Sequence, residues 1–87
     1  MNIADDVAWT SNELRVVAMD LSSPGATPYV LEDSAALIWR EIAATGRIRV
    51  DELTRRLSEQ FDIEAARIQT DVETLLADLV ARRLLRS

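Results

Sequence analysis

The sequence has no cysteine, no histidine and no lysine, and only two glycines among its 87 residues. Without cysteine it can form neither disulfides nor thiolates, and without cysteine or histidine it lacks the usual ligands of zinc. The missing histidine also removes the commonest general base near neutral pH. A nucleophilic serine would have no histidine partner, and a Ser-x-x-Lys pair cannot exist without lysine. Two glycines are too few for a glycine-rich phosphate-binding loop. We expect a protein that is not an enzyme and binds no cofactor.

Positive charge and long apolar runs are also scarce. Ten basic residues face 15 acidic ones, and the resulting formal net charge of −5 disfavours binding to phosphate backbones or anionic lipid. No apolar run approaches the length of a membrane span, and Met1–Asp6 has neither the basic nor the apolar part of a signal peptide. We therefore expect a cytoplasmic protein that binds no nucleic acid and no membrane, with proteins or peptides as partners.

The acidic residues do not occur at the spacing of metal ligands. They include the adjacent pairs Asp5-Asp6, Glu32-Asp33 and Asp51-Glu52, which lack the alternating Asp or Asn and the Gly of a calcium loop. We interpret these pairs as helix caps and solvated charge, so no metal site is expected.

Apolar residues make up 48% of the chain and are spread along most of its length, which predicts one folded domain over residues 1–87. A domain of this size buries only about 60% of the surface that its unfolded chain exposes. No deep substrate cavity is expected.

The first third of the chain has the two-residue period of strands. We predict strands over Val7–Thr10, Glu13–Leu21 and Thr27–Leu31, with Ser11-Asn12 and Pro24-Gly25 as turns and Gly25 at a positive φ. In the second strand one face holds Leu14, Val16, Ala18 and Asp20, and the other holds Arg15, Val17, Met19 and Leu21.

The strand Thr27–Leu31 contains Pro28, which cannot donate to a β-ladder and therefore predicts a strand with an open side. An open edge can pair with another chain, although it can also be an ordinary edge with nothing added to it. Tyr29 and Val30 fall on opposite faces, and the pattern does not decide which of them faces the core.

From Glu32 the period changes to about 3.6 residues, which predicts three helices. The first begins at Asp33 or Ser34, either of which could cap it with a side-chain hydrogen bond, and ends at Gly46. The second opens at Asp51 and is broken at Asp62-Ile63, and the third runs from about Glu64 to Leu84. Their apolar stripes are Ala35, Ile38, Trp39 and Ile42; then Leu53, Leu57 and Phe61; then Ile68, Val72, Leu75, Leu76, Leu79 and Val80. The last turn of the third helix is predicted to hold Arg82, Arg83 and Arg86, which suit the helix dipole.

Strands followed by helices predict an α+β domain with a three-stranded antiparallel sheet followed by three helices, which is also the element count of a winged helix. A winged-helix DNA-binding regulator is one alternative function. It would need basic and amide side chains on its third helix. The face opposite the core stripe is acidic instead, with Arg67, Thr70, Asp71, Thr74 and Asp78 and with Glu64 and Glu73 nearby.

A second alternative is an acyl or peptidyl carrier protein, because Asp33-Ser34-Ala35 at a helix start resembles the Asp-Ser site of those domains. Carrier domains are all-helical, whereas here a strand precedes the serine. The usual glycine and the following Leu or Ile are also missing, so a helix cap explains this stretch better.

The segment Tyr29–Trp39 resembles the "-x-V-x-L-N-x-T-A-x-x-I-W-" stretch of the PqqD-like family. The resemblance continues through Val50–Leu53, Leu57, Gln60–Ile63, Val72, Leu75-Leu76, Leu79 and Arg83–Leu85, and so covers nearly the whole chain. Glu32 departs from the pattern, because the family often has asparagine there, which affects only the capping of the first helix.

This resemblance implies a precursor-peptide recognition element for ribosomally made, modified peptides. Such domains bind a leader peptide as an added antiparallel strand on their third strand, in the cleft against their third helix. A chain this short looks most like the free-standing leader-binding protein of a lasso-peptide pathway, whose precursor passes to a separate leader protease and a cyclase.

The residues and the resemblance predict the same peptide-binding groove. Main-chain groups of the third strand would hydrogen-bond the peptide, and residues on one stripe of the third helix would line the other wall, with Leu75 as an apolar floor. The predicted site residues are Thr27, Pro28, Tyr29, Val30, Leu31, Arg67, Thr70, Asp71, Thr74, Leu75 and Asp78. The protein is expected to be a monomer or a weak homodimer, because open edges also pair with themselves.

Overall fold

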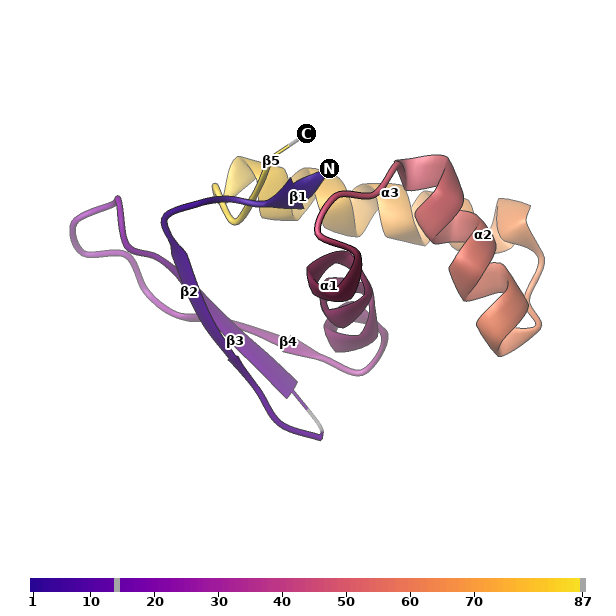
Figure 1. Cartoon of the computed structure of the whole chain (residues 1–87), viewed down its shortest axis with the longest axis horizontal. Coiled ribbons are helices and arrows are strands. Elements are labelled where there is room, and N and C mark those ends of the chain that lie inside the picture. The colour runs from indigo at the N-terminus through magenta and orange to yellow at the C-terminus, as the bar shows by residue number, and fades with distance from the viewer. Residues whose placement is uncertain (14, 87) are drawn as a thin grey trace.

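The computed structural model describes residues 1–13 and 15–86, and the elements below refer to them (Figure 1). Along the chain these are strands β1 (Asn2–Ile3), β2 (Val7–Ser11), β3 (Arg15–Asp20) and β4 (Tyr29–Glu32), helices α1 (Ser34–Thr45), α2 (Val50–Phe61) and α3 (Ala65–Ala81), and strand β5 (Leu85–Arg86). The predicted α+β fold, a three-stranded antiparallel sheet followed by three helices, is confirmed.

The main sheet has the order β2-β3-β4, and both neighbouring pairs are antiparallel. The predicted alternation of β3 is confirmed, because Val16, Ala18 and Asp20 are buried while Arg15 is exposed. Leu14, which was predicted to share a face with Val16 and Ala18, lies outside the described residues. Gly25 has a φ of 76°, as the turn between β3 and β4 was predicted to require.

The third predicted strand has different bounds from those expected. It begins at Tyr29 and ends at Glu32, so Thr27 and Pro28 belong to the preceding loop. Pro28 has no N–H for a ladder, which favours a start after it. β4 is nevertheless at the edge of its sheet, as the proline predicted.

Helix α1 is not capped as predicted. Asp33 occupies the N-cap position with a φ of 54°, and its side chain forms no capping hydrogen bond. Ser34 is the first helical residue, and it is not the cap either. A capping side chain reaches the free N–H groups from an extended backbone, which this positive φ does not provide. The predicted end is confirmed, since Gly46 follows the helix with a φ of 84° and its N–H donates to Ile42 O at 2.9 Å.

Helix α2 begins at Val50, one residue before the predicted start, and ends where Asp62 adopts a left-handed φ of 52°. Leu53 and Leu57 of its predicted stripe are buried. Phe61, the third member, is instead 41% exposed, because it is the last helical residue and the chain turns away beyond it.

Helix α3 buries Val72, Leu76 and Leu79, and the other predicted stripe members are half-buried. It ends at Ala81, three residues before the predicted end, so its last turn contains no arginine. Arg82 is the C-cap residue and Arg83 has a left-handed φ of 63°. This sharp turn lets the next two residues, Leu84 and Leu85, enter the core, and Arg86 lies in β5.

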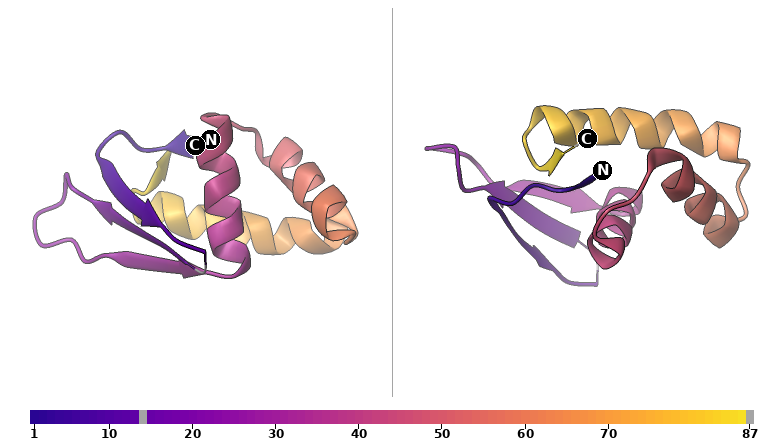
Figure 2. Two further views of the ribbon diagram at one scale, coloured as in Figure 1. Left: turned by 60° about the horizontal axis from the view of Figure 1, so that its bottom comes forward. Right: turned by 45° about the horizontal axis from the view of Figure 1, so that its top comes forward.

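Strands β1 and β5 were not predicted. They form a two-stranded antiparallel ribbon in which Ile3 pairs with Leu85, and it brings the two ends of the described chain together (Figures 1 and 2). Strands of two residues are too short to show a period in the sequence.

Helix α1 lies between the sheet and α2, and α3 runs along the molecule across both parts (Figure 2). The core combines the inner face of β3 and β4 with all three helices, and fully buried Trp39 of α1 is its largest member. Trp9 of β2 contacts Trp39 edge to face, with ring centroids 6.1 Å apart. No helix among the described residues is long and apolar enough to span a membrane.

Candidate functional site

The hydrogen bonds around β3 show which of its main-chain groups face each neighbour. In continuation of the β2–β3 register, Asn12 N–H donates to Arg15 O at 3.0 Å and Leu21 N–H donates to Asp6 O at 2.8 Å. The main-chain groups of successive strand residues point to alternate sides, so the odd-numbered residues of β3 face β2 and the even-numbered ones face β4.

The same alternation identifies the free edge of β4. The even-numbered residues of β3 are in register with Tyr29 and Leu31, which therefore take the hydrogen bonds between these strands. Val30 and Glu32 direct their N–H and C=O groups away from β3, where no strand of the described chain pairs with them. Pro28 is also even-numbered, so an N–H at this position would point away from β3, and its absence removes no hydrogen bond to β3.

The side chains of β4 alternate as well, which decides the question that the sequence left open. Leu31 is 1% exposed and Tyr29 is half-buried, whereas Val30 is 44% exposed. Tyr29 and Leu31 therefore face the core, and Val30 faces out.

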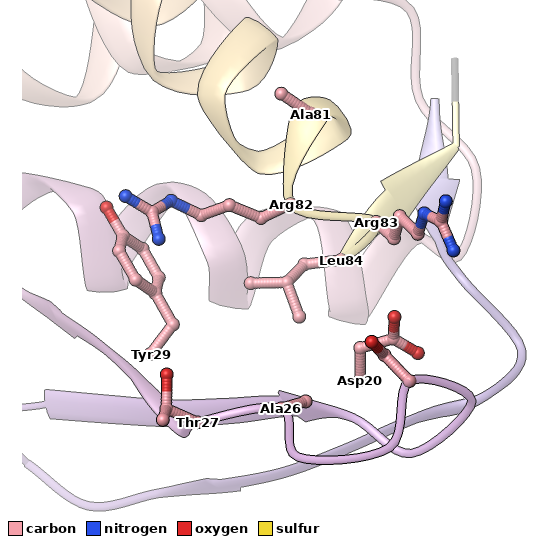
Figure 3. Close-up of a pocket in the computed structure, with 9 residues that line it drawn as sticks. Asp20, Ala26, Thr27, Tyr29, Ala81, Arg82, Arg83 and Leu84 are labelled. Atoms are coloured by element: carbon pink, nitrogen blue, oxygen red, sulfur yellow. The ribbon is translucent and has the colours of Figure 1, made fainter.

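Tyr29 links β4 to the C-terminal end of α3. Its hydroxyl donates to Asp78 Oδ2 at 3.1 Å, and Arg82 Nε donates to the same oxygen at 3.0 Å. The Arg82 guanidinium carbon lies 4.2 Å from the centre of the Tyr29 ring (Figure 3). Burial, and then the hydrogen bond to Asp78, raises the pKa of Tyr29, so the phenol remains a donor at neutral pH.

A cavity of about 280 Å³ lies at the start of β4, beside this link (Figure 3). We call it the arginine cavity, because Arg82 and Arg83 line one side of it. Thr27, Ala26 and Asp20 lie on the opposite side. Two guanidinium groups, one of them paired with Asp78, and the carboxylate of Asp20 give this small space a polar wall.

A larger cavity of about 680 Å³ lies beyond the other end of β4, among the three helices, and we call it the apolar cavity. Most of its wall is aliphatic or aromatic, and Asp33, Ser34 and Asp71 are its polar members. The apolar members are Ala35, Leu37, Ile38, Leu57, Phe61, Ile63, Ile68, Val72 and Leu75. The open edge of β4 thus runs from a polar cavity lined by arginines to an apolar one.

A family model for coenzyme PQQ synthesis protein D (PqqD) matches residues 15–85, most of the chain. The chain belongs to the PqqD family. A solved structure described as "TbiB1 in Complex with the TbiA(beta) Leader Peptide" superposes with a TM-score of 0.85 at 21% sequence identity, and covers 100% of this chain and 96% of that one. That structure shares the fold, and its protein is bound to a leader peptide. A comparison with curated proteins finds no match.

In this PqqD-family chain, the predicted site residues on α3 fall into two groups. Asp78 bonds Tyr29, while Asp71 and Leu75 line the apolar cavity. Arg67, Thr70 and Thr74 are exposed and line neither cavity, and the Thr74 hydroxyl donates to the carbonyl of Thr70 in its own helix at 2.9 Å.

On the other wall, Tyr29 and Thr27 line the arginine cavity, Val30 offers main-chain groups, and Leu31 is a core residue. Pro28 precedes the strand and is exposed. Sequence reasoning missed Arg82 and Arg83 as site residues, because it placed them inside α3 as partners of the helix dipole. Their sequence carries no signal of a contact with β4.

The described part of the chain contains no group of acidic side chains that could form a metal centre. Among residues 1–13 and 15–86, no three Asp or Glu side chains gather in a way that could hold a metal ion.

Proposed function

We propose that this protein binds the leader region of a ribosomally made precursor peptide as an added antiparallel strand on the outer edge of β4. The observation that carries the proposal is the pair of outward-facing residues, Val30 and Glu32, whose N–H and C=O groups have no strand partner in the described chain. A peptide strand would pair with these groups without regard to its own sequence.

The two cavities would supply the specificity that main-chain pairing lacks. A strand on the edge of β4 would lie beside α3, because Tyr29 already ties the two elements together through Asp78. Apolar side chains of the peptide could enter the apolar cavity next to Leu75 and Ile68. Membership of the PqqD family and the shared fold with a leader-peptide complex support this arrangement.

The biological setting belongs to the same proposal. A non-catalytic binding domain would deliver the captured precursor to separate enzymes, a leader protease and a cyclase of a lasso-peptide pathway. The resemblance found in the sequence suggests this pathway. The TbiB1 fold is compatible with it.

The test is a calorimetric titration with a synthetic leader peptide, whose sequence is to be sought in short reading frames that neighbour the gene of this chain. We expect a Kd in the micromolar range or lower, about −8 kcal/mol. Duplex DNA should not bind at moderate salt, because the net charge is −5. Tighter binding of DNA than of the leader would contradict the proposal.

Val30→Pro sharpens this test, because it removes an N–H that faces away from β3. The variant should stay folded by circular dichroism and bind the leader at least about fivefold more weakly, since one main-chain hydrogen bond is lost. Val30→Ala, which keeps the N–H and shortens an exposed side chain, is the matched control and should bind within about twofold of the wild type. Equal binding by folded Val30→Pro would place the peptide elsewhere.

A further inference from the structure

The arginine cavity holds donors that the fold itself leaves available. We propose that it is a subsite for an acidic side chain, Asp or Glu, of the bound peptide, and that Arg83 donates hydrogen bonds to its carboxylate. This inference rests on the proposed function, because the peptide must lie along β4 for its side chain to reach the cavity.

Arg83 occupies a backbone position that favours glycine. The end of α3 is closed by two bonds, Arg83 N–H to Val80 O at 2.9 Å and Leu84 N–H to Leu79 O at 2.9 Å, which together form a Schellman motif. The residue in the left-handed conformation of this motif is Arg83, with a φ of 63°. A side chain there costs stability that glycine would not cost. Strain of this kind at the wall of a cavity suggests that the side chain is used.

The guanidinium of Arg83 is available for a ligand. Within residues 1–13 and 15–86 it forms no hydrogen bond and no ion pair. Its electrostatic neighbour is Asp20, which is 7% exposed and whose Oδ1 accepts bonds from Ser22 N–H at 2.9 Å and Ser22 Oγ at 2.6 Å. The bonds from Ser22 to this one oxygen lower the pKa of Asp20, so Asp20 stays ionised at neutral pH, and it forms no ion pair with Arg83 within 4 Å.

The Arg82 side chain points away from Arg83, to the Tyr29 end of the cavity (Figure 3). Its Nε is held by Asp78 and its guanidinium lies over the Tyr29 ring, so the guanidinium that remains for a ligand is that of Arg83. A carboxylate fits this chemistry, because guanidinium groups present paired donors that match its two oxygens.

The charge of the whole molecule supports an acidic ligand at this point in particular. The protein carries a net charge of −5 and would repel an acidic peptide over most of its surface. The arginine cavity is a local exception beside the strand edge that the peptide would use, because Arg82 is paired with Asp78 whereas Arg83 forms no ion pair with any described residue.

The direction of β4 predicts where the acidic residue lies in the peptide. β4 runs from the arginine cavity at Tyr29 to the apolar cavity at Asp33. An antiparallel partner runs the other way, so its N-terminal part meets the apolar cavity and its C-terminal part meets the arginines. The peptide should therefore carry an apolar residue followed, about four to six residues later, by Asp or Glu, which matches a strand rise of about 3.3 Å per residue.

The experiment uses a random peptide library, displayed on phage and selected against the immobilised wild-type protein. Enriched peptides should show this order of apolar and acidic residues. A selected peptide is then synthesised with its acidic residue and with the Gln or Asn equivalent, and both are titrated into the wild type and Arg83→Gly. We expect the amide peptide to bind the wild type about five- to tenfold more weakly, and the two peptides to bind Arg83→Gly alike.

Two controls separate this subsite from general effects. Arg83→Gly should unfold at an equal or higher urea concentration than the wild type, so that weaker binding cannot be due to unfolding. Arg47→Gln removes the same charge from the α1–α2 connection, outside both cavities, and should bind the acidic peptide as the wild type does.

The outcomes distinguish the two proposals. Selected peptides that bind along β4 but show no acidic preference, or that bind Arg83→Gly unchanged, would overturn the acidic subsite alone. Selected peptides that do not perturb the amide signals of β4 in NMR spectra would contradict the proposed function as well.

Discussion

At the scale of single residues, the hydroxyl of Tyr29 joins two elements that lie far apart in the sequence. Asp78, its acceptor, is 49 positions away and also accepts a bond from Arg82. One carboxylate thus holds a phenol and a guanidinium together, and the guanidinium stacks on the phenol ring. Interactions within such a cluster are expected to depend on one another.

A double-mutant cycle tests this link. Tyr29→Phe should lower the free energy of unfolding by about 0.5 to 1 kcal/mol, since it removes one half-exposed hydrogen bond and little apolar area. Asp78→Ala should cost more, because it removes the bonds of both Tyr29 and Arg82. The measurement is urea unfolding of both single variants and the double variant, and a coupling energy of about 0.5 kcal/mol or more is expected. Strictly additive costs would show that the two side chains do not interact in solution.

At the scale of elements, each of the three helices is followed closely by a residue with a positive φ. Gly46 follows α1 at 84°, Asp62 follows α2 at 52° and Arg83 follows α3 at 63°. The left-handed conformation ends each helix and turns the chain sharply toward the next element. Between the first two, Arg56 of α2 adds bonds to Glu41 at 3.0 Å and Thr45 at 3.1 Å on α1.

These turns predict substitutions of opposite sign. Gly46→Ala should lower the free energy of unfolding by about 1 kcal/mol through backbone strain alone, because a Cβ there would meet nothing within 4 Å. Asp62 already carries the strain of a side chain at a positive φ, so Asp62→Gly should leave the free energy of unfolding unchanged or raise it. Urea unfolding of the two variants checks both signs, and a Gly46→Ala variant as stable as the wild type would rule out the left-handed turn.

At the scale of the whole molecule, periodic segments made most of the fold predictable from the sequence. The stripe of α3 keeps its spacing over several turns, and its central members Val72, Leu76 and Leu79 are indeed buried. Pro28 correctly indicated the edge strand, even though it precedes the strand. The side-chain cap at Asp33 failed because it depends on a backbone angle, and the ribbon of β1 and β5 is too short to have a period.

The candidate site was predictable in its location and less so in its residues. Edge strand and third helix follow from pattern, whereas the meeting of Tyr29 with Asp78 and Arg82 is a contact between distant segments that no local rule encodes. Arg83 was misplaced for a related reason. A helix end marked by arginine instead of glycine looks like a continuing helix in the sequence, and the turn became visible only with the backbone.

The central claim is that the main-chain groups of Val30 and Glu32 are unpaired in the free protein and pair with a peptide strand. Amide hydrogen exchange measured by NMR tests this claim most directly. In the free protein, the amides of Tyr29 and Leu31 should exchange slowly and those of Val30 and Glu32 fast. Saturation with the synthetic leader peptide should slow Val30 and Glu32 by at least about tenfold. Amides of Val30 and Glu32 that are already protected in the free protein, or that stay fast with the peptide bound, would contradict the account.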